Sequence, residues 1–183
     1  MTEDELKRDI IVKQYDVALA TRNFEIELFW KRSLFFWGFI ASAFVGYATL
    51  EQAKSPLAIA IACFGFICSF AWTLVNRGSK RWQENWEIIV SEIEENVTGA
   101  LFNKRRIKAN KPLWLSASNF SVSKIAIALS DFTVIIWFSF LIHYLINLYP
   151  KILHISSSEI TVLAILGTIA FAMIMYHFGK SSD

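Results

Sequence analysis

Four long runs of apolar residues constrain this chain more than any other feature of its sequence. Together they contain one acidic or basic residue, Asp131. A bilayer core is crossed by about 20 mostly apolar residues at the helical rise of 1.5 Å each. Only a helix closes its own backbone hydrogen bonds over such a length in lipid. We therefore predict an all-α, four-span membrane domain over residues 1–183, with transmembrane helices at 33–50, 55–76, 125–149 and 160–178.

Basic residues are distributed unevenly around these spans. Sixteen of the eighteen Lys and Arg residues lie in the segments 1–32 and 77–124 or follow the last span, and only Lys54 and Lys151 lie in the other two loops. Lys and Arg collect in cytoplasmic loops. This bias predicts a multi-pass protein of a bacterial inner (cytoplasmic) membrane with both termini in the cytoplasm. The thirteen charged residues among the first 32 argue against a secretory signal peptide.

Two amphipathic helices are expected outside the spans. The first, within residues 1–32, should run without a break into span one, and the second should follow span two. We predict that they pack apolar face to apolar face as a cytoplasmic hairpin stalk, with Trp82 and Trp86 buried; a partner or a membrane surface is the alternative use of these faces. The two stripes are Ile10, Gln14, Val17, Thr21, Phe24 and Leu28, and Trp82, Trp86, Ile89, Val90, Ile93 and Val97.

Charged residues of both signs flank spans one and two. In an antiparallel pair of helices, Glu25 or Glu27 would lie at the depth of Lys80 or Arg81, close to Arg77. We predict ion pairs there that set the register of the two helices. Paired carboxylates can also be catalytic, but no nucleophile or base accompanies these, so the structural interpretation is favoured.

A basic run follows the second amphipathic helix. Such a run can bind anionic lipid headgroups, and it can equally be ordinary positive-inside topology. Nucleic acid is not expected as a partner, because no stacking platform or binding fold accompanies the charges. The residues are Lys104, Arg105, Arg106, Lys108 and Lys111.

Asp131 is the residue of the spans that most needs an explanation. It lies about 10 Å below the cytoplasmic interface at helical rise, seven residues after Lys124. A carboxylate at that depth must be paired, protonated or hydrated. It could pair with Lys124, hydrogen-bond to a hydroxyl of a neighbour, or line the water-filled lumen of an oligomer.

No catalytic, metal-binding or cofactor-binding motif stands out. Cys63 and Cys68 point to different faces of one helix, and His143, His154 and His177 are scattered without metal-ligand spacing or a Ser-His-Asp arrangement. The sequence therefore predicts a protein that is not an enzyme and that has neither a metal ion nor a cofactor.

Three stretches carry a resemblance to a known family. Residues 22–33, 76–87 and 121–125 resemble small bacterial inner-membrane proteins of the RipA type, a family described as octameric membrane proteins and linked to intracellular growth. The resemblance implies a homo-oligomer, possibly an octamer, without known enzymatic activity. An ion channel or small transporter formed by the oligomer is the alternative function.

Small residues recur every four positions on three of the spans, which permits close helix packing in lipid. Some of these faces could join neighbouring protomers, or all could serve packing within one chain. The repeats are Gly38, Ser42 and Gly46; Gly65, Ser69 and Thr73; and Ala164, Thr168 and Ala172.

Overall fold

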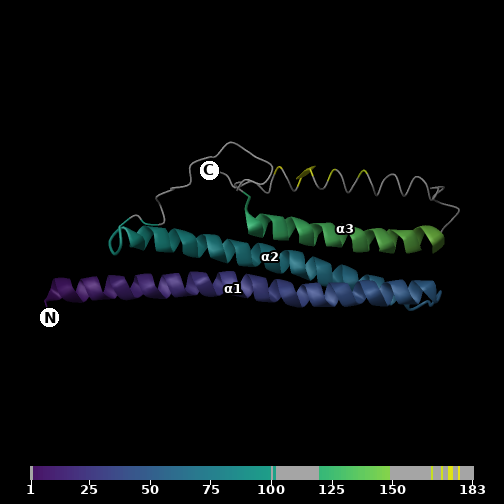
Figure 1. The fold of residues 1–183 in the computed structure, drawn as a ribbon, viewed down its shortest axis with the longest axis horizontal. Coiled ribbons are helices and arrows are strands. Elements are labelled where there is room, and N and C mark those ends of the chain that lie inside the picture. Colours follow the sequence, from purple (N-terminus) through teal and green to yellow (C-terminus); the bar gives the residue numbers. More distant parts are fainter. Residues whose placement is uncertain are drawn as a thin grey trace, which may run out of the picture. The chain divides into compact units, whose positions relative to one another are not determined.

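The chain forms three long helices in the part that the computed structural model describes, which comprises residues 2–99, 101 and 120–148 and the single residues 166, 170, 173, 174 and 177. No strand occurs among these residues, so the predicted all-helical fold is confirmed for them. Figure 1 labels the three helices as α1 (Glu3–Gln52), α2 (Ala58–Glu94) and α3 (Val122–Leu148).

Each of the three helices contains a segment long and apolar enough to cross a membrane. These segments coincide with the predicted spans at 33–50, 55–76 and 125–149. The fourth predicted span, 160–178, lies outside the described residues except for a few single positions.

Helix α1 runs without interruption from the charged N-terminal segment through the first span, as predicted. Its start is fixed by a reciprocal capping box. The Glu5 carboxylate accepts a hydrogen bond from the Thr2 backbone N–H at 2.6 Å, and Thr2 Oγ1 accepts one from the Glu5 N–H at 3.3 Å. Acidic side chains in the first turn also suit the positive end of the helix dipole.

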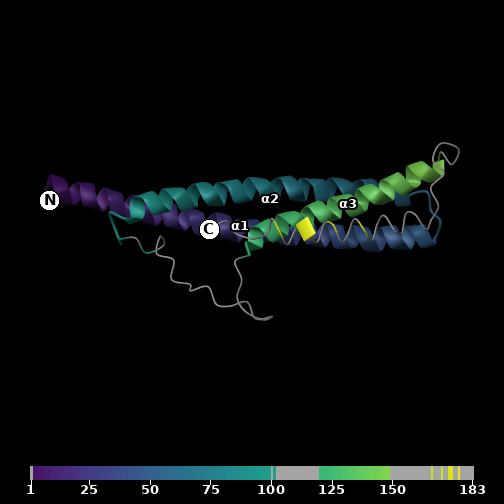
Figure 2. The same ribbon diagram turned by 90° about the horizontal axis from the view of Figure 1, so that it is seen from above.

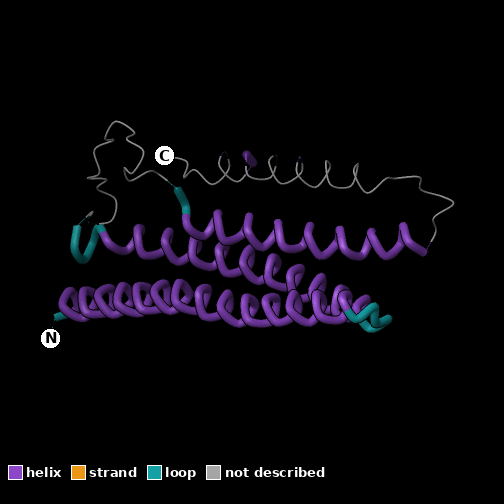
Figure 3. Tube along the Cα trace, turned by 45° about the vertical axis from the view of Figure 1, so that its right-hand side comes forward, coloured by secondary structure: helices purple, strands orange, loops and turns teal. Residues whose placement is uncertain are grey.

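The turn between α1 and α2 is short, and it is drawn as loop in Figure 3. Lys54 adopts a left-handed conformation with φ of 50°, and the Ser55 N–H donates to the Leu50 carbonyl at 2.9 Å. This geometry ends α1 and reverses the chain. At the start of α3, Ser121 Oγ accepts a hydrogen bond from the Lys124 N–H at 3.4 Å and so caps the helix.

The chain divides into two compact units, each held by its own contacts. The charged unit comprises Met1–Arg32 and Arg77–Ser118, and the apolar unit comprises Ser33–Asn76 and Asn119–Asp183. In each unit a stretch of α1 lies beside a stretch of α2, as Figures 1 and 2 show. Helix α3 belongs to the apolar unit. The core of the charged unit is formed by Tyr15, Ala18 and Val90, and that of the apolar unit by Ala43, Ala62 and Trp137.

Candidate functional site

A chain of polar side chains links all three helices inside the apolar unit. Asn76 of α2 lies at its centre and is completely buried. Its Oδ1 accepts a hydrogen bond from Ser33 Oγ of α1 at 3.3 Å, and its amide Nδ2 donates to Ser130 Oγ of α3 at 3.4 Å. The Trp72 indole N–H donates to Ser33 Oγ at 3.3 Å. The network therefore fixes the register of three helices at one depth.

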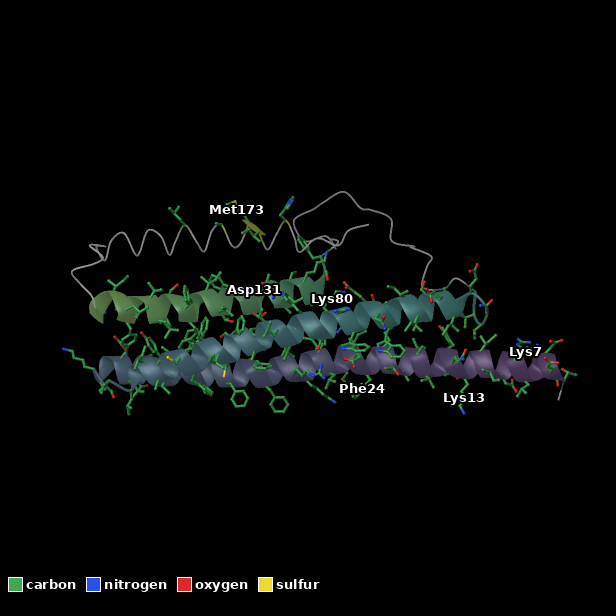
Figure 4. All side chains as sticks on the ribbon, turned by 180° about the vertical axis from the view of Figure 1, so that it is seen from behind. Lys7, Lys13, Phe24, Lys80, Asp131 and Met173 are labelled. Carbon is green, nitrogen blue, oxygen red and sulfur yellow. The ribbon has the colours of Figure 1, made fainter. Side chains whose placement is uncertain are left out.

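Asp131 lies beside this network on α3. Thr73 Oγ1 of α2 donates to its carboxylate at 3.2 Å, so a hydroxyl of the same protomer contacts the carboxylate of the span. Figure 4 shows Asp131 where α3 meets α2. The sequence interpretation considered a basic residue of the same chain, a neighbour's hydroxyl or a lumen; Thr73 was not among those candidates. Its position, three residues before Asn76 on the same helix face, is the signal that could have found it.

Trp137 fills the contact between α2 and α3 further along the span. Its ring lies against Gly65, where a Cβ atom would overlap the indole. Phe44 of α1 stacks on the same ring with centroids 4.4 Å apart. Among the described residues, neither Ser69 Oγ nor the indole N–H of Trp137 has a hydrogen-bond partner, although both side chains are completely buried. Close packing of a glycine against an aromatic ring therefore substitutes for hydrogen bonds here.

The repeat of small residues on α2 thus serves contacts within one chain at Gly65 and Thr73. Gly46 of α1 is also near its own chain, with the Ile61 side chain 3.8 Å from where a Cβ would lie. Gly38 differs, because nothing lies within 4 Å of that position. Of the two described repeats, only the one on α1 has a glycine that is open to another molecule.

Polar contacts also close the far end of the apolar unit. The Tyr144 hydroxyl of α3 donates to the Glu51 carboxylate of α1 at 2.5 Å. Tyr47 and Phe140 stack in parallel with centroids 4.6 Å apart. The three helices are therefore tied together at both ends of the span and in its middle.

In the charged unit, α1 and α2 pack through an apolar core, as predicted, but through a different face of α1. Trp86, Ile89, Ile93 and Val97 of α2 pack against the buried residues Tyr15, Ala18 and Val90, which agrees with the predicted stripe. The predicted stripe of α1 is wrong by one residue. Ile10, Val17 and Phe24 are exposed, and the buried positions are Tyr15, Ala18 and Phe29.

Trp82 is also exposed, contrary to its predicted burial. Its side chain is 57% exposed, whereas Gln83, the next residue, is buried. The reason is geometric: one residue turns a helix by about 100°, so Trp82 lies at the edge of the face that meets α1. Trp86 lies one turn further on and closer to the core, and it is half-buried.

The predicted ion pairs across the helix pair are replaced by other pairings. Glu27 pairs with Lys31 at 2.7 Å and Lys80 with Glu84 at 3.3 Å, in each case one turn away on the same helix. An ion pair that does cross between the helices joins Arg22 and Glu87 at 3.4 Å.

A hydrogen bond also joins the two helices at another position. Arg32 Nη1 donates to Ser79 Oγ at 2.9 Å. The contacts across the helix pair are therefore an ion pair and a hydrogen bond to a hydroxyl, whereas the prediction was of ion pairs alone and between other residues.

One side of this helix pair is open. A groove of about 490 Å³ runs between the two helices, lined mainly by apolar side chains. The side chains come from both helices: Ile10, Lys13, Gln14, Val17 and Ala18 of α1, and Trp86, Ile89 and Ile93 of α2.

Buried Glu94 is a residue that sequence reasoning missed. It lies near the end of α2 and has no exposed surface. Its backbone carbonyl accepts hydrogen bonds from the N–H groups of Thr98 at 2.9 Å and Gly99 at 3.1 Å, which closes the end of the helix. No periodic signal distinguishes Glu94 from the exposed glutamates beside it.

The described part of the chain shows no cluster of metal-ligand residues. No three His, Cys, Asp or Glu residues there are placed to hold a metal ion. Cys63 and Cys68 are free thiols. The basic run, Lys104, Arg105, Arg106, Lys108 and Lys111, lies outside the described residues.

Comparison with known proteins places the chain in one family. The model of the octameric membrane protein family matches residues 12–146, a range that includes all of α2 and most of α1 and α3. No curated protein and no solved structure matches the chain.

Proposed function

Since this chain belongs to the octameric membrane protein family, we propose that it is a non-enzymatic homo-oligomer of a bacterial inner membrane, acting through its assembly and its charged helix pair. The family's description implies a membrane protein that self-associates. The observation that supports the proposal best is that the family match covers the three apolar helices and the charged unit together.

The polar network supports the same proposal. Hydrogen bonds and close packing, rather than apolar burial, associate helices in lipid. The Ser33, Asn76 and Ser130 contacts tie the three helices into one rigid building block. Such a block can offer its other faces to neighbours without losing its own structure.

Native mass spectrometry in mild detergent tests this proposal. An octamer gives a mass eight times that of the 21.0 kDa chain. A single assembly with fewer subunits would still support a homo-oligomer and would correct only the number of subunits. Detection of only the 21.0 kDa monomer across several mild detergents would contradict self-assembly.

The proposed topology has four spans and both termini in the cytoplasm. It rests on the sixteen of eighteen basic residues on one side of the predicted spans. The basic run from Lys104 to Lys111 would then lie beside anionic headgroups. Reporter fusions near Asn103 and after Asp183 should report cytoplasm, and fusions near Gln52 and His154 the opposite side. A periplasmic signal after Asp183 would contradict the span number.

A cation channel is the second candidate, and Asp131 is the observation that favours it. The side chain is only half-buried in the single chain, and a ring of carboxylates in an oligomer would attract cations. Against it, α3 contains no Asp, Glu, Lys or Arg after Asp131 that would continue a polar path, and its outer half offers only hydroxyl groups, Asn147 and His143. Ion flux into liposomes containing the purified protein distinguishes a channel from an assembly without conduction.

A further inference from the structure

The groove of the charged unit is an apolar surface that the described residues leave uncovered. Ile10 and Val17 line it and are 48% and 56% exposed. The groove lies between the two helices, which the Arg22–Glu87 ion pair also joins. Exposed apolar side chains that gather in one groove mark an interaction surface, whereas such side chains scattered singly do not.

The spacing of the lining residues identifies a helix as the occupant. On α1, the lining residues Ile10 and Val17 are seven residues apart, and Phe24, outside the groove, continues the spacing. On α2, the lining residues Trp86 and Ile93 are also seven apart. Such a repeat keeps an apolar stripe straight along a packed helix. A third helix could therefore lie along both stripes at once.

The charges around the groove distinguish between two possible occupants, an anionic lipid surface and a helix of another copy of the chain. Lys13 is the single charged residue that lines the groove, whereas a surface for anionic lipid would carry a cluster of Lys and Arg. The charged unit itself is nearly balanced. Residues 1–32 and 77–118 together carry twelve acidic and fourteen basic side chains, and five of the basic ones belong to the run from Lys104 to Lys111. Two copies of this unit can approach without strong repulsion.

We infer that the groove between α1 and α2 of the charged unit receives a helix of the charged unit of a neighbouring copy of this chain. The inference rests on the proposed homo-oligomer and names the surface that would join its subunits. A groove on one copy that receives a helix of the next copy joins two different surfaces. Contacts of that kind close into rings where the rotation between copies closes.

Thiol labelling at the groove tests the inference. Val17→Cys places a thiol in the groove, and Ile88→Cys, at a site 59% exposed and outside the groove, is the matched control. Both are made with Cys63→Ala and Cys68→Ala. For each variant, the rate of reaction with a water-soluble maleimide is measured in the intact oligomer and in the monomer released by stronger detergent. Native mass spectrometry identifies the species.

The inference predicts that Val17→Cys reacts at least about tenfold more slowly in the oligomer than in the monomer, because an interface opens only by dissociation or local unfolding. Ile88→Cys should change by less than about twofold between the same two states, since its site opens to solvent in both. Ile10→Cys, also in the groove, replaces Val17→Cys if that variant assembles poorly.

The other outcomes would overturn the inference in distinguishable ways. If the oligomer is intact and Val17→Cys reacts as fast in it as in the monomer, the groove is not a contact between copies. The proposed function is unaffected by that result. If native mass spectrometry detects only monomers, both this inference and the proposed homo-oligomer are wrong. Slow labelling that persists in the monomer would assign the groove to the chain's own segments. Slow labelling that requires anionic vesicles would assign it to the membrane. Equal slowing of Ile88→Cys would indicate general shielding.

Discussion

The charged unit and the apolar unit are built from the same two helices, yet different contacts hold each together. In the charged unit, Tyr15, Ala18 and Val90 form an apolar core, and the ion pair between Arg22 and Glu87 lies at its edge. In the apolar unit a hydrogen-bonded polar network lies inside, next to an apolar core of Ala43, Ala62 and Trp137, and apolar side chains cover the outside. The charged unit also buries one carboxylate, that of Glu94.

The different solvents of the two units, water and lipid, explain why different contacts hold them together. In water, burial of apolar surface drives helices together and polar groups stay outside. In lipid the tails are as apolar as leucine, so apolar burial between helices gains little. Hydrogen bonds such as that from Asn76 to Ser130, and close packing such as Trp137 on Gly65, must then supply the specificity.

Loss of a large side chain from the charged unit is expected to have the largest effect. Trp86→Ala should lower the free energy of unfolding of the dissociated chain by about 3 kcal/mol, at the low end for tryptophan because Trp86 is half-buried. Trp82→Ala, at an exposed site, should cost at most about 0.5 kcal/mol. Titration with SDS, followed by far-UV circular dichroism, measures both. Equal losses of stability in the two variants would contradict the assignment of Trp86 to the core and Trp82 to its edge.

Overpacking in the apolar unit should come next. Gly65→Val forces Trp137 out of its site and should cost about 1–3 kcal/mol. Gly78→Val is the matched control on the same helix, where nothing lies within 4 Å of the added side chain. It should be neutral or slightly stabilising, because glycine is the poorer helix former. A harmless Gly65→Val in the same SDS titration would contradict the packing of α3 on α2.

The polar centre should show a smaller but specific effect. Asn76→Ala removes two hydrogen bonds to neighbouring helices and should cost about 1 kcal/mol, since such bonds within membranes average about 0.6 kcal/mol each. Asn85→Ala, at an exposed position of the charged unit, should leave stability unchanged. If both variants unfold at the wild-type SDS fraction, polar contacts do not hold the apolar unit together.

Asp131→Asn is expected to have the smallest effect. The amide oxygen can still accept the hydrogen bond from Thr73, so assembly should weaken by no more than about 0.6 kcal/mol. Neither wild type nor variant should let cations leak from liposomes. A selective cation current from the wild-type protein, abolished in Asp131→Asn, would instead favour the channel.

The helices were predictable because their signals are local. Each described span shows its length and lack of charge directly in the sequence, and Ser121 marks the start of α3 by residue type. The unbroken α1 follows from the absence of proline and glycine before Gly38.

The contacts between helices were less predictable. Helix α1 carries two adjacent stripes, and the more apolar one, with Ile10, Val17 and Phe24, is exposed. Helix α2 packs on the stripe that contains Tyr15, Ala18 and Arg22, because Arg22 reaches Glu87 there. The hydrophobicity of α1 alone does not predict which of its stripes is buried, because a pairing such as Arg22 with Glu87 also depends on the register of α2.

The central claim is that the exposed surface of the apolar unit faces lipid, whereas that of the charged unit faces water. Native Cys63 tests it, because its side chain is exposed on α2. In intact membrane vesicles that admit the reagent to both faces, and with Cys68→Ala, Cys63 should resist a water-soluble maleimide. A cysteine introduced by Asn85→Cys, with both native thiols replaced by alanine, should react readily, and both thiols should react after SDS is added. Rapid reaction of Cys63 in the intact vesicles, at the rate of the Asn85→Cys thiol, would contradict the account.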